Sequence, residues 1–134
     1  MKSNALRILI VDDHLDTLRC IAHLFRKLGY ATLTAHCCVD ARVAARAGAP
    51  DVVVSDVGLP DGDGIALLEE LKSRHGIASV ALTAHVMPAD VSRYDRADID
   101  CYLAKPAGIN ELADVVESLG TIARWRAPQA RRSA

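Results

Sequence analysis

Apolar residues along the chain follow two spacings, one typical of buried strands and one typical of amphipathic helices. Five short runs rich in branched apolar residues predict strands over residues 6–11, 30–35, 51–56, 78–84 and 101–105. Apolar residues three or four positions apart predict helices over residues 15–28, 39–48, 64–75 and 88–97, and from 109 to beyond 119. Gly29, Gly48 and Gly76 are expected to end the first three helices, and Pro88 to begin the fourth.

Strands that alternate with helices indicate an α/β fold, because each connecting helix must bury its apolar stripe against the sheet. We therefore expect a doubly wound parallel sheet, covered by helices on both faces and joined by right-handed crossovers. At 134 residues the chain has room for one ordinary domain. That domain is predicted to cover residues 1–123, followed by an arginine-rich, flexible tail over 124–134.

The charge balance argues against several classes of partner. The formal net charge is −1, so overall electrostatics favour neither nucleic acid nor an anionic membrane. No apolar run approaches the roughly 20 residues that a bilayer-spanning helix needs, and Asp12 and Asp13 follow the first strand too soon for a signal peptide. We expect a cytoplasmic protein with no direct DNA binding and no membrane contact.

The cysteines and histidines show no metal-binding spacing. The four cysteines form no C-x-x-C pair, which argues against a zinc site and against a disulfide framework. Cys20 and Cys101 are expected to be small buried thiols in a helix and a strand. The adjacent pair Cys37 and Cys38 is open to two interpretations, a redox-sensitive pair or an incidental one.

Polar side chains gather where the predicted strands end. Asp12 and Asp13 follow the first strand, Asp56 ends the third, Thr83 lies at the end of the fourth and Lys105 ends the fifth. Ligands of such sheets bind beyond the carboxyl ends of the strands, so we expect these side chains to converge. Three neighbouring carboxylates repel one another unless a cation neutralises them, and Mg²⁺ suits an all-oxygen site. Mn²⁺ accepts the same ligands.

An aspartate in this setting is equipped for phosphoryl chemistry. Held against a metal ion and the Lys105 ammonium, with the Thr83 hydroxyl nearby, Asp56 could attack phosphorus and carry an acyl phosphate. Gly58, two residues later, lets the chain turn so that its main-chain carbonyl could face the metal ion. The site therefore predicts phosphoryl transfer to an aspartate.

Four motifs in this order, "ILIVDD", "VVVSDVGLPDGDG", "VALTA" and "YLAKPA", resemble the receiver domain of bacterial two-component response regulators over residues 6–122. The resemblance implies a flavodoxin-like fold, with five helices around a five-stranded sheet in the order 2-1-3-4-5. It also implies that Asp56 is the phosphoacceptor, and that Mg²⁺ is held by Asp12, Asp13, Asp56 and the main-chain carbonyl of Gly58.

The resemblance assigns further roles around the phosphoacceptor. Lys105 would pair with the phosphate, Thr83 would be the switch hydroxyl, and Tyr102 would occupy the aromatic switch position. Pro106 matches the proline that follows a cis peptide bond in this family. One departure is Asp98, which stands where the family usually has a glycine, so an unfavourable backbone conformation is a concern there.

The implied function is that of a signal receiver rather than a classical enzyme. A histidine kinase or phosphotransfer protein would donate the phosphoryl group to Asp56, and the receiver would catalyse only this transfer and its own dephosphorylation. The surface formed by the fourth helix, the fifth strand and the last helix would then change its binding to an output protein that the sequence does not identify. Formation of a homodimer on phosphorylation is a further expectation.

Alternative functions remain open at this stage. The chain could act alone, or be a receiver module of a hybrid histidine kinase or another multidomain regulator. A phosphatase of the haloacid dehalogenase kind needs a second aspartate where this chain has Gly58. A flavodoxin needs an anion-binding loop where this chain has "DDHLD". A binding module that kept the fold without the switch is the remaining alternative.

Overall fold

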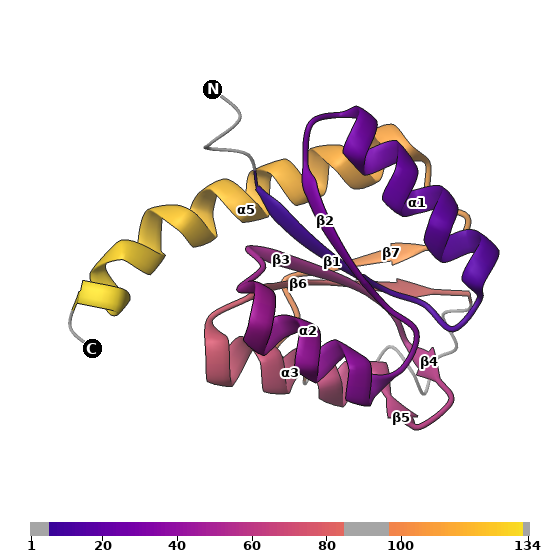
Figure 1. Ribbon diagram of the computed structural model, residues 1–134, viewed down its shortest axis with the longest axis horizontal. Helices are drawn as coiled ribbons and strands as arrows, with labels where there is room; N and C mark the ends of the chain where they lie inside the picture. The colour runs from indigo at the N-terminus through magenta and orange to yellow at the C-terminus, as the bar shows by residue number, and fades with distance from the viewer. Residues whose placement is uncertain (1–5, 85–96, 133–134) are drawn as a thin grey trace.

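The computed structural model describes residues 6–84 and 97–132, with side chains to residue 125. Its elements in chain order are β1 (Arg7–Val11), α1 (Leu15–Lys27), β2 (Ala31–Ala35), α2 (Cys38–Gly48), β3 (Val52–Asp56), β4 (Gly58–Leu59), β5 (Gly62–Asp63), α3 (Gly64–His75), β6 (Ala78–Thr83), β7 (Cys101–Ala104) and α5 (Ile109–Arg132) (Figure 1). The helix predicted over 88–97 falls almost entirely outside the described residues.

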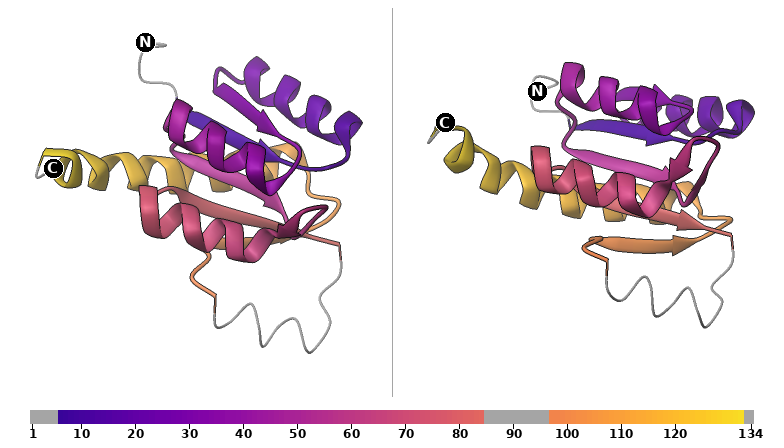
Figure 2. Two further views of the ribbon diagram at one scale, coloured as in Figure 1. Left: turned by 60° about the horizontal axis from the view of Figure 1, so that its bottom comes forward. Right: turned by 90° about the horizontal axis from the view of Figure 1, so that it is seen from below.

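Five of the strands form one parallel sheet in the order β2-β1-β3-β6-β7. Since β6 and β7 are the fourth and fifth of the predicted strands, the sheet order that the resemblance implies is confirmed. Helices α2 and α3 cover one face of the sheet, and α1 and α5 cover the other (Figures 1 and 2). The fold is therefore flavodoxin-like, and a doubly wound sheet is what the alternation of periodicities predicts.

The apolar residues of the strands divide between two cores because successive side chains point to opposite faces. In β1, Leu9 and Val11 pack with α2 and α3, whereas Ile8 and Ile10 pack with α1 and α5. All four are at most 1% exposed. A strand that is apolar at every position is thus a strand buried on both sides, and such strands can place polar groups only at their ends.

The last helix extends further than the sequence predicts. Helix α5 runs to Arg132, across residues where we expect a tail, and it protrudes beyond the sheet in Figure 1. Past residue 123 the helix is still tied to the domain, because Arg124 Nε lies 3.1 Å from Oδ1 of Asp51, the residue before β3. This ion pair joins residues far apart in the chain, so local composition does not reveal it. Residues 124–132 are therefore helical, whereas the domain boundary after residue 123 and the flexibility of the segment stay predictions.

No described helix is both long enough and apolar enough to cross a membrane.

Candidate functional site

The carboxyl ends of four neighbouring strands bring the predicted site residues together at one edge of the sheet. Asp12 follows β1, Asp56 ends β3, Thr83 ends β6 and Lys105 follows β7. The pairing of β6 with β7 sets Thr83 opposite Ala104, and the Lys105 main-chain N–H donates a 2.8 Å hydrogen bond to the Thr83 carbonyl. Parallel register therefore places the hydroxyl and the ammonium beside the carboxylates.

Asp12, Asp13 and Asp56 form a compact carboxylate cluster. One carboxylate oxygen from each lies within 4.8 Å of the other two. Their environments differ, since Asp12 is 2% exposed while Asp13 is exposed to solvent. Three negative charges at this separation repel one another, so the cluster favours a bound cation.

Lys105 supplies one positive charge to this cluster. Its Nζ lies 3.0 Å from Asp56 Oδ2 and 3.7 Å from Asp12 Oδ2. The other oxygen of Asp56, Oδ1, accepts a 3.3 Å hydrogen bond from the Gly58 main-chain N–H. Asp56 is thus held at both oxygens, and its side chain keeps 18% of its surface exposed for a reacting group.

One oxygen of Asp12 supports the expected metal ion. Asp12 Oδ1 accepts a 2.9 Å hydrogen bond from the His14 main-chain N–H. Asp12 Oδ2 is buried without a hydrogen-bond partner among the described residues, and Lys105 Nζ at 3.7 Å is too distant to donate one. A buried carboxylate oxygen that lacks a donor is costly, and a hard cation with oxygen ligands satisfies it. The donor set and this oxygen both fit Mg²⁺.

The two predicted switch residues lie on neighbouring strands. Thr83 is 4% exposed at the end of β6. Tyr102 in β7 pairs with Ala81, two positions before Thr83, and packs against the core shared by α2 and α3. Thr83 therefore lies at the site, and Tyr102 lies one strand further out, towards the edge of the sheet.

The loop after Asp56 contains a short hairpin that the sequence does not predict. Strands β4 and β5 pair in antiparallel fashion, with two residues each, too few for a recognisable periodicity. Gly64 follows the hairpin and approaches Asp56 so closely that a Cβ on Gly64 would overlap the main-chain oxygens of Asp56 and Val57. A glycine at position 64 is thus required by the approach of α3 to the phosphoacceptor loop.

Asp61 ties this loop to α2, a role that sequence reasoning missed. Its two carboxylate oxygens accept hydrogen bonds from the main-chain N–H groups of Cys38 (2.7 Å) and Val39 (3.1 Å). The bond from Cys38 is the main reason that the pKa of the Asp61 carboxyl is lowered. The sequence gives no sign of this role, because Asp61 and Cys38 are more than 20 positions apart. It becomes visible only when the start of α2 is seen to lie beside the hairpin.

Two further positions bear on the sequence-based expectations. The Lys105–Pro106 peptide bond is cis, as the resemblance implies. Asp98 does not adopt a positive φ, which among the described non-glycine residues occurs at Ala49. Instead, the Asp98 carboxylate lies 3.0 Å from Lys72 Nζ. The concern about the backbone at Asp98 was therefore wrong.

The cysteines differ from expectation in one respect. Cys20 is exposed and Cys101 is half-buried, so the prediction of buried thiols was wrong for Cys20. The residue lies on the solvent side of α1, because the apolar stripe there is narrower than the sequence suggested. Cys38 is the buried thiol, and burial raises its pKa to about 11, with a further contribution from Asp61.

Comparison with known proteins is consistent across sequence and structure. The family model described as "Response regulator receiver domain" matches residues 8–117. The transcriptional regulatory protein KdpE of Mycobacterium tuberculosis is 32% identical over 127 residues, which are 95% of this chain and 52% of that protein. The sensor histidine kinase RcsC of Salmonella typhi is 33% identical over 106 residues, 78% of this chain and 11% of that protein. The chain thus spans about half the length of the KdpE relatives and 15% of the transcriptional regulator NtrC of Escherichia coli.

Solved structures show the same fold. A receiver domain of a signal transduction histidine kinase from Syntrophus aciditrophicus superposes with a TM-score of 0.80 at 31% identity, covering 87% of this chain and 91% of that one. A CheY-like receiver domain protein from Methanospirillum hungatei gives a TM-score of 0.82 at 23% identity, covering 90% and 98% of the two chains.

Proposed function

The chain belongs to the response regulator receiver domain family, and from that premise we propose that Asp56 accepts a phosphoryl group from a phosphohistidine of a histidine kinase or phosphotransfer protein. The Asp56 carboxylate oxygen attacks phosphorus, the phosphorus–nitrogen bond of the phosphohistidine breaks, and the imidazole leaves with the electron pair. The product is an aspartyl phosphate in which the chain itself carries the signal.

The observation that carries this proposal is the ion pair of 3.0 Å between Asp56 Oδ2 and Lys105 Nζ within the carboxylate cluster. A carboxylate at the end of a buried strand with an ammonium beside it is positioned both to attack and to have its product neutralised. The Lys105 ammonium would shift from the Asp56 carboxylate to the phosphate once the phosphate has formed. Its side chain is 30% exposed, which leaves room for this shift. The Thr83 hydroxyl would donate to a phosphate oxygen.

The same cluster would hold a divalent cation. Asp12, Asp13 and Asp56, with the main-chain carbonyl of Gly58, are the ligands that we assign to Mg²⁺, or to Mn²⁺ in its place. When bound, the cation neutralises charge on the transferring phosphoryl group. The buried Asp12 Oδ2, which lacks a hydrogen-bond donor among the described residues, supports this assignment.

The output of phosphorylation would be altered binding of a partner. Thr83 and Tyr102 lie two positions apart in register on neighbouring strands, which supports a coupled switch in which Thr83 would move towards a phosphate and Tyr102 would turn inward. We propose that the surface of β7 and α5, with the helix expected over 88–97, changes as a result and binds an output protein or a second copy of the chain. The site of action would be the cytoplasm.

Two settings for this receiver are supported by its relatives. The sensor kinase RcsC contains a matching segment within a much longer protein, whereas the polar-differentiation response regulator DivK of Brucella ovis, at 27% identity, is matched over 93% of its length. The chain could accordingly work as a module of a larger regulator or alone. In both settings the chemistry at Asp56 would be the same.

The proposal is tested by intact mass after incubation with Mg²⁺ and acetyl phosphate or phosphoramidate, small phosphoryl donors that need no kinase. We expect the wild type to gain the mass of one phosphoryl group, and to gain none when Mg²⁺ is chelated. Asp56→Asn should gain none, whereas Asp16→Asn, the same change at an exposed position of α1, should react like the wild type. Equal labelling of Asp56→Asn and wild type would contradict the proposal, as would the absence of labelling at every time point.

A further inference from the structure

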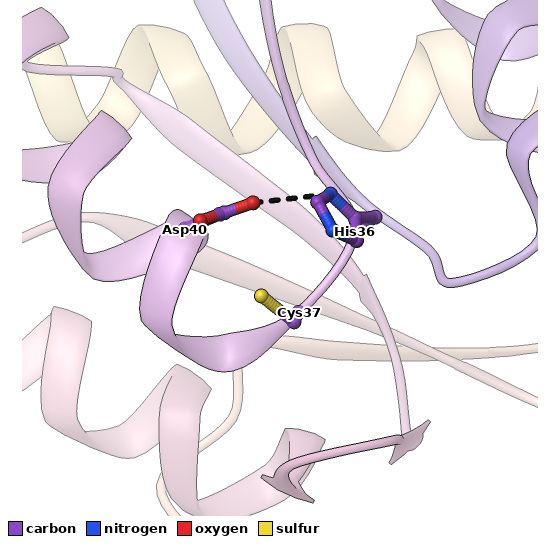
Figure 3. Close-up of side chains that lie close together, drawn as sticks. All are labelled: His36, Cys37 and Asp40. Carbon is purple, nitrogen blue, oxygen red and sulfur yellow. Dashed lines mark ion pairs between the residues drawn. The ribbon is translucent and has the colours of Figure 1, made fainter.

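Three side chains of different metal-binding chemistry meet where β2 passes into α2. His36 follows β2, Cys37 immediately precedes α2, and Asp40 lies in the first turn of α2. One ligand atom from each lies within 4.8 Å of the other two, and Figure 3 shows the three side chains at this junction. The closest pair is His36 Nδ1 and Asp40 Oδ2, at 3.0 Å. The three residues lie within five consecutive positions of the chain, 36–40.

The donor set differs from that of the phosphorylation site. An imidazole nitrogen, a cysteine sulfur and one carboxylate oxygen are ligands that Zn²⁺ binds, whereas Mg²⁺ and Ca²⁺ prefer sites made of oxygen. We propose that His36, Cys37 and Asp40 bind a transition metal ion of the Zn²⁺ type, with the fourth position of the tetrahedron taken by water. The proposal concerns a second metal site and is independent of phosphoryl transfer at Asp56.

The backbone at the junction is fixed on both sides, so the ligands are held on rigid elements. The Asp12 main-chain N–H donates a 3.1 Å hydrogen bond to the carbonyl of Ala35, which anchors the end of β2. The Ala41 main-chain N–H donates a 3.0 Å hydrogen bond to the carbonyl of Cys37, which begins the helical ladder. Side-chain rotation would bring the three ligand atoms, which already lie within 4.8 Å of one another, around an ion.

Cys37 has no structural task that would compete with metal binding. The residue occupies the N-cap position of α2, yet its side chain makes no capping hydrogen bond. Asp61 caps the helix instead, by accepting from Cys38 and Val39. A cysteine is also a poor N-cap, which prefers serine, threonine, aspartate or asparagine.

Of the two adjacent cysteines, only Cys37 suits a metal ion. A cysteine that binds a metal ion does so as a thiolate, so its sulfur must be within reach of the ion. Cys38 is 2% exposed and packs in the core between the sheet and helices α2 and α3, so an ion from solvent cannot reach its sulfur. Cys37 is partly exposed, and the side chains of His36 and Asp40 are 58% and 47% exposed. An ion from solvent can therefore reach all three ligands.

Charge is balanced when the ion binds. The Cys37 S–H bond breaks and its proton passes to solvent, so that a thiolate and the Asp40 carboxylate face the two positive charges of the ion. His36 coordinates as the neutral imidazole. Without a metal ion the pair of His36 and Asp40 is an exposed contact one helical turn apart, which contributes little to stability.

Titration with Co²⁺ tests the proposal, because a cobalt–thiolate bond gives a charge-transfer absorption band in the near ultraviolet. The full chain is titrated in excess Mg²⁺, which is expected to occupy the carboxylate cluster of Asp12, Asp13 and Asp56. Any Co²⁺ that still binds there has no sulfur ligand and therefore gives no cobalt–thiolate band. We expect the band in the wild type, its loss on addition of Zn²⁺, and its absence in Cys37→Ser. Cys20→Ser, the same change at the exposed cysteine of α1, should keep the band.

The other two ligands are tested by affinity. His36→Ala and Asp40→Asn should each weaken Co²⁺ binding by at least about tenfold. Loss of a residue that only hydrogen-bonds to a metal ligand already weakens metal binding by about that factor. Both residues are exposed, so these variants should fold. No band in the wild type, a band that persists in Cys37→Ser, or unchanged affinity in His36→Ala and Asp40→Asn would each overturn the proposal. None of these outcomes depends on whether Asp56 is phosphorylated.

Discussion

At Asp56, a strand buried on both faces ends in a carboxylate whose two oxygens have different partners. Oδ2 faces the Lys105 ammonium at 3.0 Å, and Oδ1 accepts from the Gly58 main-chain N–H. The cost of placing a charge at the edge of a hydrophobic core is offset by these contacts and by the cation that the cluster would bind. The identity of these residues could be predicted from the strand ends. The unsatisfied Oδ2 of Asp12 could not, because it depends on the burial of a single oxygen.

Gly64 offers a test of how tightly the loop is packed against the phosphoacceptor. Gly64→Ala places a Cβ against the main-chain oxygens of Asp56 and Val57, which cannot move away as a side chain would. We expect the free energy of unfolding to fall by about 1–3 kcal/mol, as for other overpacked sites, measured by urea denaturation. Gly58→Ala is the matched control, since nothing lies within 4 Å of a Cβ there, and its effect should stay within about 0.5 kcal/mol. Equal stability of the two variants would contradict this account of the loop.

Among the elements, α2 ends at Gly48 as its sequence predicts, but the residue that caps it differs from expectation. Gly48 is the expected terminator, yet the residue with left-handed conformation is Ala49, at φ 45° and ψ 61°. Gly48 instead packs against the side chain of Leu33 in β2, where a Cβ would meet a methyl group. Gly48 is therefore needed for close packing between the helix and the strand. The left-handed capping conformation, which is unfavourable for a residue with a Cβ, is adopted by Ala49. The local sequence cannot show whether a glycine near a helix end is needed for the cap or for packing against a distant strand.

This strain predicts that Ala49→Gly stabilises the protein. Left-handed conformation costs alanine about 1–2 kcal/mol, and glycine avoids this cost. Glycine also makes the unfolded chain more flexible, which lowers the free energy of unfolding and offsets part of the stabilisation. We expect a net gain of about 0.5–1 kcal/mol in the free energy of unfolding. Ala47→Gly, the same change at an exposed helical position of α2, should instead lose about 1 kcal/mol. If both substitutions destabilise the protein equally, the conformation at Ala49 is not the one described.

The contact between the start of β2 and α5 should depend on pH. The Tyr30 hydroxyl donates a 2.6 Å hydrogen bond to Glu117 Oε2, and burial together with this bond raises the pKa of the Tyr30 phenol to about 12. Because the folded state holds the proton more tightly, the stabilisation is complete below the ordinary pKa of 10.0 and is lost as the pH rises to about 12.

Tyr30→Phe isolates this contribution, since it keeps the edge-on ring contact with Phe25 and removes only the hydroxyl. At pH 8 we expect the variant to be less stable than the wild type by about 1 kcal/mol. The difference should shrink between about pH 10 and 12, where the Tyr30 phenol loses its proton. A difference that stays constant over this range would show that the phenol does not carry the pH dependence.

At the scale of the whole molecule, alternating periodicity was sufficient to predict the class of fold, and the resemblance supplied the strand order. Both are confirmed. The class of fold was predictable because strands buried on two faces are apolar at nearly every position. What could not be predicted depends on contacts between distant residues. These include the anchoring of α5 through Arg124 and Asp51 and the capping of α2 by Asp61.

The central claim is that four strand ends assemble a site in which one particular aspartate becomes phosphorylated. The most direct test is to identify the modified residue after reaction with acetyl phosphate and Mg²⁺. Borohydride reduces an aspartyl phosphate to homoserine, and peptide mass analysis then locates the homoserine. We predict homoserine at position 56 and unmodified residues at Asp12 and Asp13. Homoserine at Asp12 or Asp13, or at no aspartate while the intact mass still rises, would contradict the account.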